Sequence, residues 1–264
     1  MKSPWSTAAA ALLLAGLLSS PAAAQLSGLE DPIVADRPDF TEGTSILDTG
    51  HFQLEGGYTF TRLGEEESHT FGELLLRYGF SQRIELRLEA GSYDRIETDG
   101  AGERISGFED PGIGLKLRLT DAATWIPGQP AVAVVAGTSV PVGDEELTSD
   151  AWEPSAVLAF DWELFDLIGL GANLGAAALD GEDGRFTQVY WSASGGYGLT
   201  ERLSGYLEYY GISEDEEGGP SLHYLDAGLT YLIHNDLQVD IRVGRGLNGE
   251  DPDDYIGVGA AVRW

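Results

Sequence analysis

Through most of the chain, apolar and polar residues alternate with a period of two. The clearest stretch spans residues 83–93, where aliphatic residues alternate with Arg83, Glu85, Arg87 and Glu89. A helix would scatter these charges around its surface, whereas a β-strand gathers all of them on one face. The alternation therefore predicts an all-β protein.

Twelve segments of about ten residues show this pattern, and ten residues are enough for a tilted strand to cross a bilayer. They span residues 51–61, 70–80, 83–93, 113–119, 132–140, 152–162, 168–176, 189–199, 203–209, 225–231, 237–243 and 256–264. Their connections alternate between short turns and longer acidic loops, the longest of which is expected over residues 94–109. We therefore predict a transmembrane antiparallel up-and-down β-barrel with short periplasmic turns and longer acidic outer loops.

A soluble β-sandwich would also alternate, with its apolar face turned into a core. The polar strand face favours the barrel because it carries both signs of charge, which can pair across strands inside a closed lumen. The predicted lumen-lining residues are Glu73, Arg77, Glu85, Arg87, Glu89, Lys116, Arg118, Glu208, Asp226, Asp240 and Arg242. They form either a salt-bridge network that fills a narrow lumen or the lining of a selective pore.

Aromatic residues near the predicted strand ends also favour the barrel, because such residues form girdles at membrane interfaces. They are Phe52, Phe60, Phe80, Trp162, Tyr197, Tyr231 and Trp264. A terminal aromatic residue at the end of an alternating strand is typical of the signal read by the barrel-assembly machinery, which we therefore expect as a partner.

The first residues have the pattern of an export signal. Lys2 precedes an apolar run over residues 8–18, which is too short to cross a membrane as a helix, and small residues follow it. We expect a signal peptide over residues 1–24 rather than an anchoring helix. A periplasmic N-terminal segment over residues 25–50 and the barrel over residues 51–264 would follow, which predicts a location in the bacterial outer membrane.

Charged residues gather in the N-terminal segment just before the first strand. Arg37 lies among Asp36, Asp39 and Glu42, and Pro38 stiffens the chain between them. Two interpretations remain open. The segment is either a plug that enters the barrel mouth and pairs with lumen charges, or an ordered lead-in that caps the first strand.

The net charge of −29 excludes a nucleic-acid partner, since such a chain repels phosphates. The acidic residues of the loops either keep the loops hydrated or bind lipopolysaccharide through divalent cations. Outer-membrane lipid and lipopolysaccharide are therefore the expected surroundings of the barrel. The chain has no cysteine, its four histidines form no zinc motif, and no Gly-x-Ser-x-Gly occurs. We therefore expect no enzyme activity, no catalytic residue, no bound metal and no cofactor.

Several short motifs resemble a known family. They are Asp36–Glu42, Gly50–Tyr58, Gly107–Lys116, Ser139–Gly143, Gly246–Asn248 and Pro252–Asp253. Together they are similar to the transporter-like bacterial outer-membrane proteins of the MetA-pathway of phenol degradation. The resemblance implies an outer-membrane barrel with a transport role, and the family name points to aromatic or hydrophobic compounds. We therefore expect a passive channel or transporter for a small solute, the alternative being a closed structural or surface-interaction barrel without transport.

Overall fold

The computed structural model describes residues 31–98, 103–121, 128–165, 168–181, 183–248 and 253–264. The signal peptide expected over residues 1–24 lies outside the described residues, as does the start of the N-terminal segment. Within the described ranges, no helix is long and apolar enough to cross a membrane.

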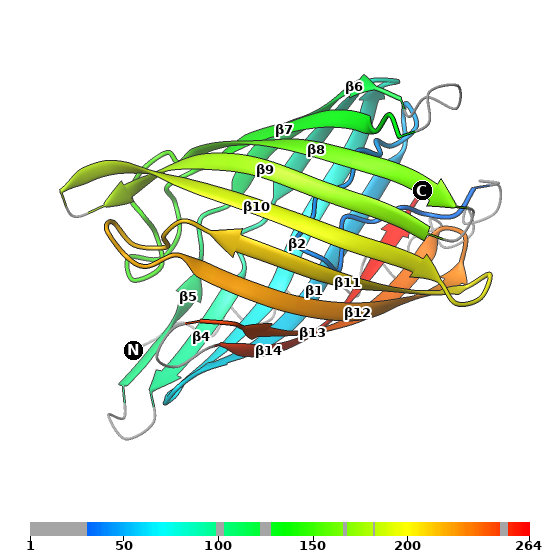
Figure 1. Cartoon of the computed structure of the whole chain (residues 1–264). Helices are drawn as coiled ribbons and strands as arrows, with labels where there is room; N and C mark the ends of the chain where they lie inside the picture. Colours follow the sequence, from blue (N-terminus) through cyan, green and yellow to red (C-terminus); the bar gives the residue numbers. More distant parts are fainter. Residues whose placement is uncertain (1–30, 99–102, 122–127, 166–167, 182, 249–252) are drawn as a thin grey trace, which may run out of the picture.

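The described residues form fourteen β-strands in one antiparallel sheet that closes on itself (Figure 1). The strands are β1 (Phe52–Leu63), β2 (Glu66–Ser81), β3 (Ile84–Glu89), β4 (Tyr93–Thr98), β5 (Glu103–Phe108), β6 (Gly112–Thr120), β7 (Ala131–Ser139), β8 (Pro154–Phe165), β9 (Ile168–Gly181), β10 (Gly184–Gly198), β11 (Leu203–Ile212), β12 (Leu222–His234), β13 (Leu237–Gly246) and β14 (Asp254–Arg263). Strand β1 pairs with β2 on one side and with β14 on the other, which closes the ring.

Two positions in the barrel wall are each occupied by two strands in line, with a short interruption between them. Strand β2 pairs with β3 near its end and with β4 near its start, so β3 and β4 occupy one position in the wall. Strands β5 and β6 are their partners in the same way, since β4 pairs with β5 and β3 pairs with β6. The described part of the chain therefore forms a closed barrel of twelve antiparallel strands, and the predicted fold is confirmed.

The loop predicted over residues 94–109 was wrong, because β4 and β5 cover most of that stretch. Their hairpin projects at the end of the barrel opposite the C-terminus (Figure 1). Strand β2 likewise begins at Glu66, inside a predicted acidic loop. The charged residues mark where the strands leave the membrane. Strand pairing continues beyond that point, because backbone N–H and C=O groups can also hydrogen-bond to each other in water.

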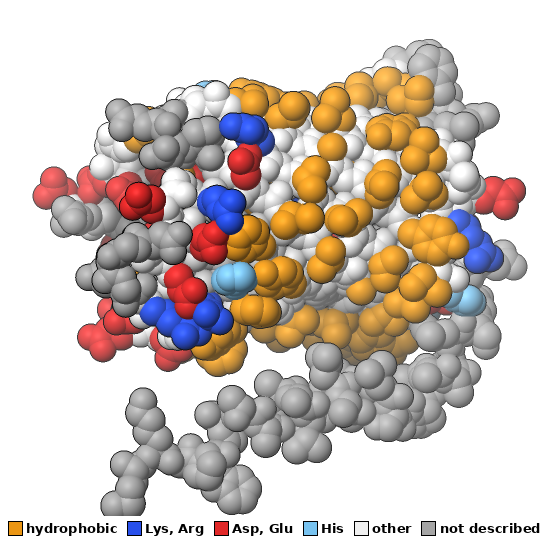
Figure 2. All heavy atoms as spheres, turned by 90° about the horizontal axis from the view of Figure 1, so that it is seen from below, with side chains coloured by type: hydrophobic (Ala, Val, Ile, Leu, Met, Phe, Trp, Pro, Cys, Tyr) orange, Lys and Arg blue, Asp and Glu red, His pale blue; other side chains and the backbone are white. Residues whose placement is uncertain are grey.

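The outer and inner faces of the wall have opposite polarity. Leucine, isoleucine and valine side chains such as Leu88, Leu174 and Val258 are exposed on the outside. Inside, Arg77 and Lys116 are fully buried. Figure 2 shows the apolar side chains as a broad band across one face of the barrel, with charged side chains gathered towards its ends. A soluble sandwich would reverse this arrangement, so the band is the surface that contacts lipid.

The two chain ends of the barrel meet at the closing seam. The backbone N–H of Phe52 donates to the Trp264 carbonyl, and the N–H of Trp264 donates to the Phe52 carbonyl, both at 2.9 Å. Their rings stack with centroids 6.1 Å apart. The terminal aromatic residue therefore lies at the junction of the first and last strands, and its role in assembly stays a prediction.

A partly exposed contact fixes the segment that joins β7 to β8. The Asp110 carboxylate accepts hydrogen bonds from the backbone N–H groups of Val142 and Gly143, at 2.9 and 2.7 Å, and from the Thr148 hydroxyl at 2.9 Å. Burial raises the pKa of Asp110, but these donors outweigh it and leave the pKa below its ordinary value. The two sequence motifs around Asp110 and around Val142 are therefore joined by hydrogen bonds.

Candidate functional site

Residues 31–50 form a loop inside the barrel (Figure 1). The loop begins where the Ile33 N–H donates to the carbonyl of Asn235, in the turn between β12 and β13, at 2.6 Å. It ends where the Gly50 N–H donates to the carbonyl of Gly79, near the end of β2, at 2.8 Å. Both contacts lie at the end of the barrel that holds the C-terminus, so the chain goes into the lumen and returns. We call this stretch the lumen loop.

Asp36 ties the lumen loop to three basic side chains of the wall. Its carboxylate accepts from the Lys116 ammonium at 2.8 Å and from Arg87, and lies 3.4 Å from the Arg77 guanidinium. Its backbone N–H donates to the Glu55 carboxylate at 3.0 Å. All four partners are buried, so the contacts form in a region from which water is largely excluded, where they are stronger than at the surface.

Arg77 joins the wall to both arms of the lumen loop. Its guanidinium donates to Glu85 at 2.8 and 2.9 Å and to Glu55 at 2.8 Å. It also donates to the carbonyl of Val34 in the inward arm and to the carbonyl of Ser45 in the returning arm, at 3.1 and 3.3 Å. One fully buried cation therefore cross-links two wall strands and both arms.

Arg37 lies flat against the wall over two glycines. Its guanidinium donates to Glu73 at 2.7 Å and to Asp240 at 3.5 Å. A β-carbon on Gly57 or on Gly259 would lie 2.3 Å from a guanidinium nitrogen of Arg37. Because no side chain fits there, these two glycines provide the space that the arginine occupies.

The tip of the lumen loop reaches the wall on the far side. The Phe40 N–H donates to the Glu208 carboxylate of β11 at 2.7 Å, and the Thr41 hydroxyl donates to the same carboxylate. The Glu42 N–H donates to the Asn173 side chain of β9 at 2.7 Å, and Asn173 donates back to the Glu42 carbonyl at 2.9 Å. The loop therefore bridges the lumen from β2 and β6 to β9 and β11.

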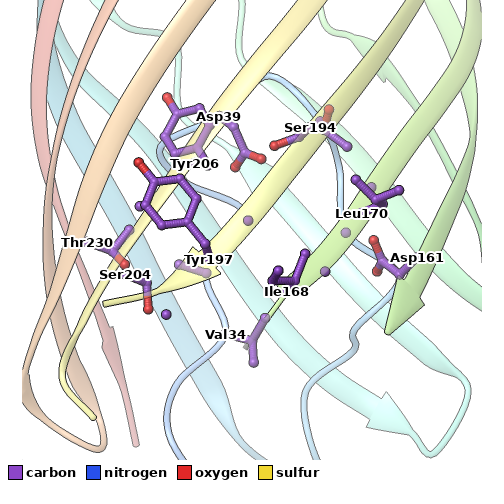
Figure 3. Close-up of a pocket in the computed structure, with 18 of the residues that line it drawn as sticks. Val34, Asp39, Asp161, Ile168, Leu170, Ser194, Tyr197, Ser204, Tyr206 and Thr230 are labelled. Atoms are coloured by element: carbon purple, nitrogen blue, oxygen red, sulfur yellow. The ribbon is translucent and has the colours of Figure 1, made fainter. Parts of the chain in front are cut away.

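A cavity of about 1050 Å³ lies between the lumen loop and strands β8 to β12. Figure 3 shows Asp39 and Ser194 near each other at one side of it and Asp161 at another. Small residues line much of it, among them Gly169, Gly171, Ser194, Ser204 and Thr230. Its charged lining residues are Arg37, Asp39, Asp161, Glu163 and Glu201.

Aromatic rings stack where the tip of the lumen loop meets β11 and β12. The Phe40 ring lies 4.4 Å from the Tyr210 ring, and Tyr210 lies 4.7 Å from Tyr224, with interplanar angles of 12° and 11°. The edge of Tyr190 faces Phe40 at 6.1 Å. Phe40 is still 39% exposed, so an apolar ring surface is open inside a lumen of polar groups.

The structure brings most of the predicted lumen residues together. The side chains of Arg77, Glu85, Arg87, Lys116, Glu208, Asp226 and Asp240 are buried inside. Glu73 contacts Arg37 of the lumen loop, and Arg242 donates to the Pro38 carbonyl at 3.1 Å. Two residues stand apart, since Glu89 is exposed beyond the cluster and Arg118 lies 3.1 Å from Asp121 near the short turns.

All four charged residues that were singled out in the N-terminal segment lie in the lumen loop. Asp36 and Glu42 contact Lys116, Arg37 contacts Glu73, and Asp39 lines the cavity. Among the described residues, no group of three or more histidines or carboxylates is arranged to hold a metal ion.

Sequence reasoning missed several lumen residues that the same alternation could have found. Tyr206 and Tyr210 share the inner face of β11 with Glu208, and Tyr224 shares that of β12 with Asp226. Aromatic residues enter the prediction only near strand ends, and only charged residues are predicted to line the lumen, so these tyrosines were not assigned to the lumen. Strand parity relative to the buried charges would have placed them inside.

The sequence profile of a known family matches residues 35–264. The chain belongs to the family of the MetA-pathway of phenol degradation. The match begins inside the lumen loop, so the MetA-pathway family profile includes most of that loop together with the whole barrel. No curated protein matches the chain.

Solved structures share the fold of this MetA-pathway family member. An outer membrane channel from Pseudomonas putida F1 has a TM-score of 0.68 at 13% identity, covering 88% of this chain and 100% of that one. The NanC porin has a TM-score of 0.53 at 13% identity, covering 80% of this chain and 98% of that one. At these identities the likeness concerns the fold, which is that of outer-membrane β-barrels.

Proposed function

We propose that the protein is a passive outer-membrane channel for small solutes, and that the lumen loop acts as a plug that sets the width of its pore. The observation that carries the proposal is the path of residues 31–50 across the lumen, fixed at Asp36, Arg77 and Glu208. Membership of the MetA-pathway family and the shared fold with an outer membrane channel support it.

The pathway that we propose runs beside the lumen loop, along β8 to β12. Small side chains on these strands leave the cavity of about 1050 Å³ on that side, whereas the side of β1 to β6 is filled by buried ion pairs. A solute would therefore meet hydroxyl groups, backbone and carboxylates rather than the basic side chains, which are held by Asp36 and Glu42.

The charge of this pathway predicts a preference for cations. The cavity lining contains four carboxylates and the single guanidinium of Arg37, which Glu73 and Asp240 already neutralise. In planar bilayers under a KCl gradient, we expect a reversal potential of the sign that K⁺ permeation gives. Glu163→Gln combined with Glu201→Gln should move that potential towards zero. Preference for Cl⁻ would contradict the pathway, and a barrel that passes no ion would favour the closed structural alternative.

We also propose that the solutes include small aromatic compounds. The open face of Phe40, the rings stacked behind it and the family description support this substrate class. An aromatic ring that stacks on Phe40 gains about 0.5–1.5 kcal/mol beyond simple burial, which corresponds to a severalfold change in affinity.

Phe40→Ala tests the aromatic preference. Block of the ion current by benzylammonium should weaken severalfold, whereas block by butylammonium should not change, because only the aromatic cation stacks. The matched control is Tyr209→Ala, which removes a ring from the outer face of the same strand that carries Tyr210. Equal loss of block for both ammonium ions would argue against stacking at Phe40.

A further inference from the structure

Arginines gather on the outer wall at the end of the barrel opposite the C-terminus. The whole chain has 15 basic and 44 acidic residues, so any concentration of positive charge is notable. Four arginines share this face, one on each of four strands, and their side chains are between 38% and 66% exposed. They are Arg62 of β1, Arg95 of β4, Arg104 of β5 and Arg245 of β13. We call them the outer arginine row.

Strand register makes this row continuous from one strand to the next. Arg245 is paired with Asp254 of β14, which is also paired with Arg62. From Arg62 the register continues through Glu67 of β2 and Glu97 of β4 to Arg104. Arg95 lies two residues below Glu97 on the same strand face. The row is therefore continuous across six neighbouring strands.

A row of aromatic side chains fixes the depth of the arginines in the membrane. Tyr58, Phe71, Tyr93 and Phe108 follow one another across β1, β2, β4 and β5, with neighbouring ring centroids 5.0, 6.4 and 5.2 Å apart. Such aromatic rows mark the boundary between lipid chains and headgroups. The strand pairing places the arginines beyond this aromatic row, on the headgroup side of the boundary. Figure 2 shows basic and acidic side chains beside that end of the apolar band.

The carboxylates within the row orient the guanidinium groups without burying them. Arg62 donates through Nε and Nη2 to one oxygen of Glu67, at 3.1 and 2.5 Å, and Arg95 donates in the same way to Glu97. Exposed ion pairs of this kind contribute at most about 1 kcal/mol, so they exchange readily for a better acceptor. A phosphate is such an acceptor, because it accepts two parallel N–H groups from arginine.

We propose that the outer arginine row binds the phosphate groups of an outer-leaflet glycolipid of the lipopolysaccharide type. The aromatic row holds the acyl chains below, and the arginines meet the phosphorylated sugars above. Most other charges in the sequence at this end of the barrel are acidic and repel phosphate, so we expect binding on the face formed by β13, β14, β1, β2, β4 and β5. This inference does not depend on whether the lumen conducts solutes.

The test compares diphosphorylated lipid A with the same lipid after removal of its phosphates, each titrated into the purified full barrel in detergent. Native mass spectrometry would count bound lipid, and heat-dependent migration on gels would confirm folding. We expect the phosphorylated lipid to bind more tightly, and Arg62→Ala combined with Arg104→Ala to weaken that binding at least tenfold. The control, Arg83→Ala combined with Arg202→Ala, removes two exposed arginines from the opposite end and should change nothing.

Three results would overturn the proposal. They are wild-type affinity in the Arg62 and Arg104 variant, equal binding of the dephosphorylated lipid, and equally tight binding of phosphatidylglycerol, which would show a general attraction for anions. If the double variant does not fold, Arg104→Ala alone is decisive, because Arg104 lies near the start of β5, at the projecting end of the β4–β5 hairpin. That single change should still weaken binding of diphosphorylated lipid A severalfold.

Discussion

Deletion of residues 32–47 should raise the single-channel conductance several-fold. The lumen loop crosses the barrel from β2 to β11, so its removal opens the cross-section that it fills. The basic groups that lose Asp36 and Glu42 would then face water, which replaces the lost partners because the lumen fills with solvent. The measurement is single-channel recording in planar bilayers, with the intact barrel as reference.

A point substitution provides a second route to the same outcome. Gly259→Val places a side chain where the Arg37 guanidinium lies, so Arg37 must leave the wall and loosen the loop. The control is Gly195→Val on β10, where an added β-carbon meets no atom closer than 3.7 Å. If the deletion and Gly259→Val both leave the conductance at the wild-type level, the lumen loop is not a plug and is the ordered lead-in to the first strand.

Replacement of Arg77 by methionine should lower the free energy of unfolding by about 3–5 kcal/mol, the usual effect of removing one member of a buried ion pair. The change leaves the carboxylates of Glu55 and Glu85 without their shared cation and removes the donor to the carbonyls of Val34 and Ser45. Urea unfolding of the folded barrel in detergent, followed by tryptophan fluorescence, would measure it.

Arg83→Met provides the reference for that measurement. Arg83 is an exposed arginine in the short turn after β2, so its loss should change the unfolding free energy by no more than a few tenths of a kcal/mol. Adding Glu85→Gln to Arg77→Met should recover part of the stability, because it removes one of the uncompensated charges. Equal stability of the two single variants would contradict the role of Arg77 as a cross-link.

The alternation of residues was enough to predict the wall of the barrel. Period two places Glu85 and Arg87 on one face and Leu86 and Leu88 on the other, and the hydrophobic effect then decides which face meets lipid. The twelve wall strands and the inward charges follow from this local rule. The wrong prediction of a loop over residues 94–109 also has a local cause. Charged residues indicate contact with water, but they say little about whether the backbone pairs as a strand.

The path of the lumen loop could not be obtained from local rules. The cluster of Asp36, Arg37, Asp39 and Glu42 indicated that the segment has charged partners, but the partners are distant in sequence. Arg37 meets Asp240, and Thr41 meets Glu208, only because the closed ring brings them together. The space over Gly57 and Gly259 is likewise a property of two neighbouring strands and is invisible in either one alone.

The contacts of the lumen loop also imply an order of assembly. Its bonds to β1 and β2 close short stretches of chain, such as that from Asp36 to Glu55, and therefore cost little entropy. Its bonds to β11 and to Arg263 close most of the chain and must come last. The first strands can thus gather around the loop while later strands are still joining, so that the ring closes over a loop already in place. In a barrel that assembles in this way, the lumen loop organises the strands around itself. In a soluble protein of this size, a hydrophobic core would have that role.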